Sequence, residues 1–217
     1  MTSAEWHSSD DVLALLNAAA DTVSDRRLRL YMLACCESAP VPHTLTAFDR
    51  AVRLLREQLD GPVHRRTVSR LREVIRAEEE ALAGVENAHL WCHAAELASC
   101  SPVTPRTAWE LVATIIQASS DENLPPIALR ESRRHTDLLR DVVHLPIANT
   151  FWSELRTVTV RLLADSIHSD SAYDRLPILA DALEEAGCDN AELLNHCRGS
   201  GPHVLGCWAL DLVRGVY

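Results

Sequence analysis

The fold class is set by residues 24–36, which read Ser-Asp-Arg-Arg-Leu-Arg-Leu-Tyr-Met-Leu-Ala-Cys-Cys. Ser24 is a residue type that caps helices, because its hydroxyl accepts a hydrogen bond from a first-turn amide. The apolar residues that follow have the i, i+3, i+4, i+7 spacing of one helix face: Leu28, Tyr31, Met32 and Cys35. This stretch therefore predicts an amphipathic helix with one apolar stripe.

The same spacing recurs further along the chain. Apolar side chains at 48, 52, 55 and 59 predict a helix that ends at Gly61-Pro62, and another apolar stripe ends at Gly84. Thr104-Pro105 is a typical helix start. No alternating run is long enough to predict a strand. We therefore predict an all-α fold, an irregular multi-helix bundle of about ten helices with a C-terminal helical subdomain.

A break in the chain is expected at residues 119–126, Ser-Ser-Asp-Glu-Asn-Leu-Pro-Pro. We expect an N-terminal helical bundle over 1–120, a linker or connecting segment over 121–136, and a C-terminal helical subdomain over 137–217 that packs on the first. A single domain overall is the alternative, since 217 residues suit either arrangement.

Composition excludes several function classes. All 21 basic residues are arginine, so the chain has neither a Schiff-base lysine nor the lysine of a phosphate loop. Seven scattered glycines do not make a nucleotide loop, and a formal charge of −10 disfavours nucleic-acid binding over the whole surface. Seven cysteines at irregular spacing predict free thiols. Without a membrane-spanning run or a signal-peptide pattern, the chain is expected to be cytoplasmic and to have no membrane contact.

The richest group of metal-competent side chains lies on one predicted helix. His89, Cys92, His93 and Glu96 share a face there, and two histidines four residues apart can chelate one ion. Glu86 and His89 also have the Glu-x-x-His spacing of di-iron bundles. These residues predict a zinc or iron site. The alternative is an ordinary helix with hydrogen-bonded histidines and buried cysteines.

A second set of ligand-type residues lies near the C-terminus and consists of Cys188, His196, His203 and Cys207. His203 and Cys207 have a spacing found in zinc sites, although no Cys-x2-Cys pair accompanies them. The alternative is structural. In that case His203 hydrogen-bonds the next helix from the turn that starts at Gly199, and Cys207 belongs to the core.

Positive charge is concentrated between residues 50 and 76, where eight arginines accompany three acidic residues. Guanidinium groups suit bidentate contacts with phosphate or carboxylate, so this stretch predicts an anion-binding or acidic-partner surface. A solvated helix face is the alternative. No interleaved aromatic residues support base stacking, so nucleic acid is not the expected ligand. The arginines are Arg50, Arg53, Arg56, Arg65, Arg66, Arg70, Arg72 and Arg76.

Four separate segments of the chain carry a resemblance to known proteins. They are residues 24–36 quoted above, Asp-Leu-Leu-Arg-Asp at 137–141, Tyr-Asp-Arg-Leu-Pro-Ile-Leu-Ala-Asp-Ala-Leu-Glu-Glu-Ala-Gly-Cys at 173–188, and Gly-Pro-His-Val-Leu-Gly-Cys-Trp at 201–208. Together they resemble an all-helical family of bacterial proteins common in planctomycetes and other GC-rich bacteria. Similar proteins tend to continue after the second segment with Gly-Asn-Pro-Phe, where this chain has Val-Val-His-Leu-Pro-Ile. The resemblance implies one packed C-terminal unit and no particular activity.

Catalytic templates are missing from the sequence. There is no Gly-x-Ser-x-Gly elbow, and acidic pairs such as Asp10-Asp11 are adjacent rather than facing. We therefore expect a non-catalytic helical binding, adaptor or regulatory module that engages a protein partner. The alternatives are a metal-binding helical bundle that uses the His89–Glu96 face, and an anion- or nucleic-acid-binding protein that uses the Arg50–Arg76 stretch.

Overall fold

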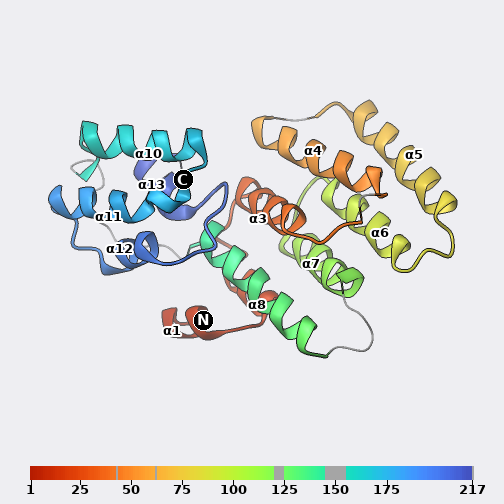
Figure 1. The fold of residues 1–217 in the computed structure, drawn as a ribbon, viewed down its shortest axis with the longest axis horizontal. Helices are drawn as coiled ribbons and strands as arrows, with labels where there is room; N and C mark the ends of the chain where they lie inside the picture. Colours follow the sequence, from red (N-terminus) through yellow and green to blue (C-terminus); the bar gives the residue numbers. More distant parts are fainter. Residues whose placement is uncertain (43, 62, 120–124, 145–154, 217) are drawn as a thin grey trace. The chain divides into compact units, whose positions relative to one another are not determined.

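The computed structural model describes residues 1–42, 44–61, 63–119, 125–144 and 155–216 (Figure 1). These residues contain twelve α-helices, one short 3-10 helix and no strand. The predicted all-α fold is therefore confirmed. No helix in the described ranges is long and apolar enough to cross a membrane. All seven cysteines are free thiols.

The chain divides into two compact units, unit 1 (Met1–Thr136) and unit 2 (Asp137–Tyr217). Helix α8 (Pro125–Val142) contributes its first part to unit 1 and its last turns to unit 2. Residues 125–136 of the expected connecting segment are therefore helical, whereas residues 120–124 lie outside the described part of the chain.

Unit 1 is built around α3 (Asp25–Glu37), which packs against α4, α6 and α7. All ten residues from Arg27 to Cys36 are buried, so the helix is enclosed on every side and does not present the single apolar stripe that was predicted. The reason is that α3 packs against three other helices instead of one neighbouring surface. The other helices of unit 1 are α1 (Ser3–Ser8), α2 (Val12–Ala19), α4 (Thr46–Asp60), α5 (Arg65–Ala81), α6 (Ala88–Ala98) and α7 (Pro105–Ser119).

Unit 2 contains α10 (Val158–Asp170), α11 (Leu176–Glu185), α12 (Ala191–Arg198) and α13 (Trp208–Arg214), drawn in cyan to blue in Figure 1. A short 3-10 helix (Tyr173–Arg175) precedes α11. The buried core of this unit centres on Trp208, which is 2% exposed, and on the apolar faces of α10 and α11. This core supports the end of α12 and the start of α13.

A tertiary contact replaces the missing local cap of α4. Leu45 occupies the N-cap position and makes no side-chain capping bond. The carboxylate of Glu78, on α5, accepts hydrogen bonds instead from the Thr46 amide (2.9 Å), the Thr46 hydroxyl (2.9 Å) and the Ala47 amide (2.7 Å). A negative charge at a helix N-terminus is also favourable because of the helix dipole. Glu78 therefore joins the two helices.

We predict that Glu78→Ala lowers the free energy of unfolding by about 1–2 kcal/mol, because the first amides of α4 lose their acceptor. Glu79→Ala is the matched control, since Glu79 is an exposed neighbour on the same helix. Urea denaturation followed by circular dichroism measures both variants. Equal destabilisation by the two substitutions would contradict the capping role.

Candidate metal centre

Within the described ranges, one group of histidine, cysteine and acidic side chains brings its donor atoms together. It consists of Asp141, His196, His203 and Cys207, whose donor atoms all lie within 4.8 Å of one another. Asp141 is in the last turn of α8, and His196 is on α12. His203 lies in the loop between α12 and α13, and Cys207 is the N-cap residue of α13. All four belong to unit 2.

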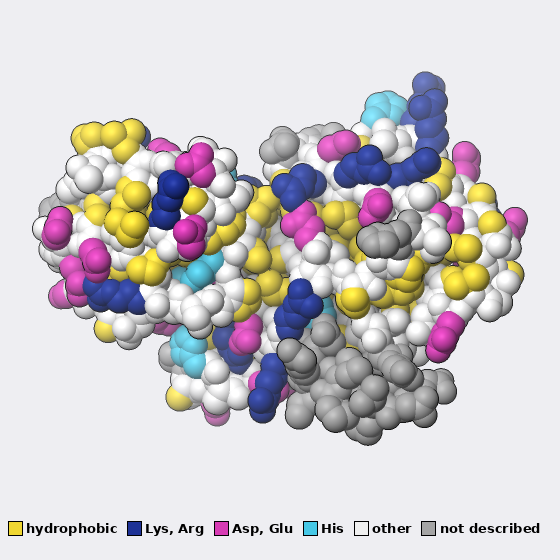
Figure 2. Space-filling model, in the orientation of Figure 1, with side chains coloured by type: hydrophobic (Ala, Val, Ile, Leu, Met, Phe, Trp, Pro, Cys, Tyr) yellow, Lys and Arg dark blue, Asp and Glu magenta, His cyan; other side chains and the backbone are white. Residues whose placement is uncertain are grey.

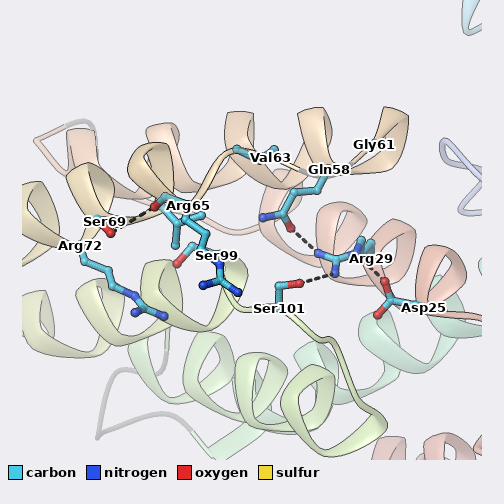
Figure 3. A pocket seen from close by; sticks show the side chains of 11 residues that line it. Asp25, Arg29, Gln58, Gly61, Val63, Arg65, Ser69, Arg72, Ser99 and Ser101 are labelled. Carbon is cyan, nitrogen blue, oxygen red and sulfur yellow. Dashed lines mark hydrogen bonds and ion pairs between the residues drawn. The ribbon is translucent and has the colours of Figure 1, made fainter.

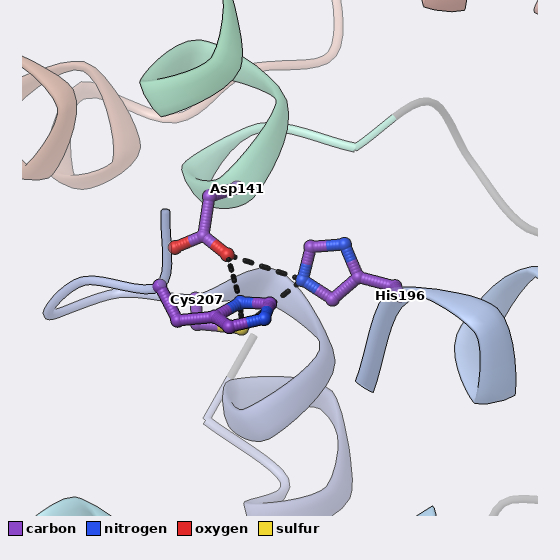
Figure 4. Close-up of side chains that lie close together, drawn as sticks. Asp141, His196 and Cys207 are labelled. Atoms are coloured by element: carbon purple, nitrogen blue, oxygen red, sulfur yellow. Dashed lines mark hydrogen bonds and ion pairs between the residues drawn. The ribbon is translucent and has the colours of Figure 1, made fainter. Parts of the chain in front are cut away.

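The carboxylate of Asp141 is the centre of this cluster and is 2% exposed. Its Oδ1 lies 2.8 Å from Nδ1 of His203 and 3.1 Å from Nε2 of His196. Its Oδ2 accepts a hydrogen bond from the Val204 amide at 2.9 Å. Nε2 of His196 also lies 3.3 Å from Sγ of Cys207. Figure 4 shows Asp141 and His196 turned toward each other beside Cys207.

A tight loop positions His203. Helix α12 begins with Asn190, whose side chain caps the Leu193 amide, and it ends at Gly199. Gly201 has φ +85°, and a Cβ atom there would lie 2.9 Å from the His203 amide nitrogen. Only glycine fits this position, since other residues rarely adopt such a φ and would clash. The chain can therefore turn back and place the His203 ring against Asp141.

Burial and hydrogen bonding act in opposite directions on the charged groups. Burial raises the pKa of Asp141, but hydrogen bonds from His196 and His203 outweigh that effect, so the net pKa is lowered. Burial lowers the pKa of His203, but its hydrogen bond to Asp141 and the carboxylate charge outweigh it, so the net pKa is raised. Burial holds the pKa of Cys207 well above its usual value. The ion-free cluster thus contains a carboxylate and a protonated thiol.

The second nitrogen of each imidazole also has a partner. Nε2 of His203 lies 3.2 Å from the Gly199 carbonyl and donates to it, because a carbonyl can only accept. Nδ1 of His196 accepts from the indole N–H of Trp208 at 3.2 Å. An indole can only donate, so the proton of neutral His196 is on Nε2, facing Asp141. Both ring nitrogens of each histidine therefore have hydrogen-bond partners within unit 2.

The structure brings together three of the four ligand-type residues predicted near the C-terminus. The fourth member of the group is Asp141 instead of Cys188. His196, His203 and Cys207 converge, whereas Cys188 is not a member of the group. Cys188 is buried and lines a separate pocket with Glu184. Sequence reasoning missed Asp141 as a ligand, because the residue is far from the others along the chain.

The group on α6 does not form a ligand set. Cys92 is buried, whereas His89, His93 and Glu96 are exposed. Nδ1 of His93 lies 3.8 Å from a Glu96 carboxylate oxygen, in a pair whose side chains are both more than half exposed. Cys92 is 2% exposed, so it is buried while the two histidines face solvent. Among the described residues, the four predicted ligands on this helix are therefore not brought together.

The arginines between 50 and 76 line more than one pocket. Figure 2 shows arginine side chains gathered over α4 and α5. Three of them, Arg50, Arg53 and Arg70, line a groove between the two helices, and Arg65 and Arg72 line a different pocket. The remaining three are exposed residues, one of them ion-paired with Glu37: Arg56, Arg66 and Arg76.

Comparisons of this chain with protein-family models, with curated proteins and with solved structures find no match. The resemblance to an all-helical bacterial family stays a prediction. Function is therefore inferred from the geometry and chemistry of the residues themselves.

We predict that Asp141→Asn lowers the free energy of unfolding of the metal-free protein by about 2–4 kcal/mol, because the amide cannot accept all the hydrogen bonds of the buried carboxylate. Asp137→Asn is the control, since Asp137 lies one turn earlier on α8 and its side chain is 52% exposed. The control should change stability by less than about 0.5 kcal/mol. Urea denaturation followed by tryptophan fluorescence measures both, and an unaltered Asp141→Asn midpoint would contradict the prediction.

Proposed function

We propose that this protein is a non-catalytic helical binding module whose unit 2 holds a zinc ion. The ligands are Asp141, His196, His203 and Cys207. The observation that supports this most is the convergence of four donor atoms within 4.8 Å in a buried part of the unit. A cytoplasmic location and a protein partner, both expected from the sequence, remain part of the proposal.

The donor set favours zinc over other ions. One carboxylate oxygen, two imidazole nitrogens and one thiolate sulfur match the ligands of tetrahedral zinc sites. Magnesium and calcium prefer oxygen ligands, so a site with a thiolate disfavours them. Zinc bonds of this kind place neighbouring donor atoms about 3.3–3.6 Å apart. The separations here include 2.8 Å between Asp141 and His203, 3.3 Å between His196 and Cys207 and 4.0 Å between His203 and Cys207, and all lie within 4.8 Å. The shortest would have to lengthen and the longer ones to shorten on zinc binding.

A structural role follows from the number of ligands. Catalytic zinc sites keep one coordination position open, whereas four protein ligands close the site. The ion would join the end of α8, the last turn of α12 and the start of α13. The hydrogen bond from His203 to the Gly199 carbonyl would orient the ring with Nδ1 toward the ion. Backbone carbonyls often hold metal-bound histidines in this way.

Zinc must displace protons from this cluster. On coordination the Cys207 thiol would lose its proton, and so would Nδ1 of His203, which donates to Asp141. Nε2 of His196 would also have to give up its proton. The His196 proton then moves to Nδ1, which can no longer accept from Trp208. Coordination and the hydrogen bond between Trp208 and His196 are therefore mutually exclusive.

Metal analysis tests the site. After zinc loading and removal of free metal, elemental analysis should find close to one zinc per chain. Cys207→Ser and His203→Gln should each lose most of it, because each removes one ligand. Two controls should retain it: Cys188→Ser, which changes the cysteine outside the cluster, and His93→Gln on α6. Wild-type protein that binds no zinc, or equal zinc in Cys207→Ser and Cys188→Ser, would overturn the proposal.

The indole of Trp208 provides an independent readout. We predict that zinc shifts the indole N–H resonance of Trp208, because this group loses its acceptor on His196. A Trp208→Phe spectrum assigns the signal. The indole signals of Trp6, Trp91 and Trp109, which lie in unit 1, are the internal control and should stay in place. Stoichiometric zinc without any shift of the Trp208 signal would exclude His196 as a ligand.

A further inference from the structure

Unit 1 contains a pocket of about 700 Å³ that is independent of the zinc cluster (Figure 3). Its walls come from the start of α3, the end of α4, the first half of α5 and the segment after α6. This volume is within the usual range of small-molecule sites. The polar lining residues are Asp25, Arg29, Gln58, Arg65, Ser69, Arg72, Ser99 and Ser101.

A buried arginine is held rigidly in the wall of this pocket. The side chain of Arg29 is 8% exposed, and its Nε donates to Asp25 at 2.9 Å. One terminal nitrogen donates to Gln58, and the other lies 3.4 Å from the Ser101 hydroxyl. These contacts use three of the five N–H groups of a guanidinium. A donor therefore remains on each terminal nitrogen.

Two further arginines line the same pocket. Arg65 and Arg72 lie seven residues apart on α5 and so share one helix face. Among the described residues, neither guanidinium group has a hydrogen bond or an ion pair. Figure 3 shows both groups directed into the space beside Ser99. Two like charges in one pocket repel each other unless an anion lies between them.

The residues around the pocket do not offset the positive charge of its three arginines. The first turn of α5, at Arg65, contains no acidic residue, and the N-terminal end of a helix attracts anions. Asp25 is the one acidic residue among the lining residues, and its carboxylate already accepts from Arg29 and from the Val103 amide at 3.1 Å. The charge of the pocket is therefore not neutralised from within.

We infer that this pocket binds a small phosphate-bearing ligand, with Arg65 and Arg72 contacting the phosphate oxygens and Arg29 forming the base of the site. Guanidinium groups match phosphate geometry, because they donate two parallel hydrogen bonds. The largely polar lining, with only Val63 and Val68 as apolar side chains, suits a sugar phosphate or a polyphosphate better than an aromatic ligand.

Calorimetric titration of the full-length protein with inorganic pyrophosphate tests the inference. Arg65→Gln and Arg72→Gln should each weaken binding about tenfold or more, the loss expected for one charge-assisted contact. Arg76→Gln is the matched control, with the same charge change on the same helix outside the pocket. Arg70→Gln tests the neighbouring groove between α4 and α5. Both of these variants should stay within about twofold of wild type.

Two results would overturn the inference. One is no detectable pyrophosphate binding by the wild-type protein at low salt. The other is equal weakening by Arg76→Gln or Arg70→Gln and by the pocket variants, which would indicate general attraction to positive charge. All four arginines are exposed, so their substitution should leave the circular dichroism spectrum unchanged. The zinc content of each variant should be unaltered, which separates this inference from the proposal for unit 2.

Discussion

The buried carboxylate of Asp141 is the constraint around which unit 2 is organised. An unpaired charge in such a place costs several kcal/mol, so the chain must supply donors wherever this side chain is enclosed. Two imidazoles and the Val204 amide do so, and they come from α12 and from the loop that follows it. The turn at Gly201 positions His203, and the indole of Trp208 hydrogen-bonds His196, so both help to keep the two imidazoles in place.

The same geometry suits two occupants, protons or a metal ion. With protons, Asp141 accepts from both histidines, and Trp208 determines which nitrogen of His196 carries hydrogen. With zinc, the longer donor separations would have to shorten, and the proton of His196 would have to change sides. The choice between the two states would therefore depend on the cost of removing protons from Cys207 and His203 and of breaking the indole hydrogen bond, relative to the energy of the metal–ligand bonds.

Unit 1 is organised differently, because its core surrounds one enclosed helix that itself carries a buried arginine. Helix α3 is buried on every side, and Arg29 is compatible with that environment since Asp25, Gln58 and Ser101 accept from its guanidinium. Helix α5 then distributes its arginines between two surfaces. Arg65 and Arg70 line different pockets, so the basic stretch is divided between two hollows of the surface.

Local sequence determined the helical class of this protein, because apolar periodicity, capping residues and glycine stops act over a few residues and need no distant partner. It also pointed to His196, His203 and Cys207, which are near one another along the chain. Tertiary structure alone decided that Asp141 joins them in place of Cys188, that Cys92 is buried while His89 and His93 are exposed, and that Glu78 caps α4. Each of these depends on which helix packs against which, and that arrangement arises from the summed burial of many apolar side chains rather than from any short motif.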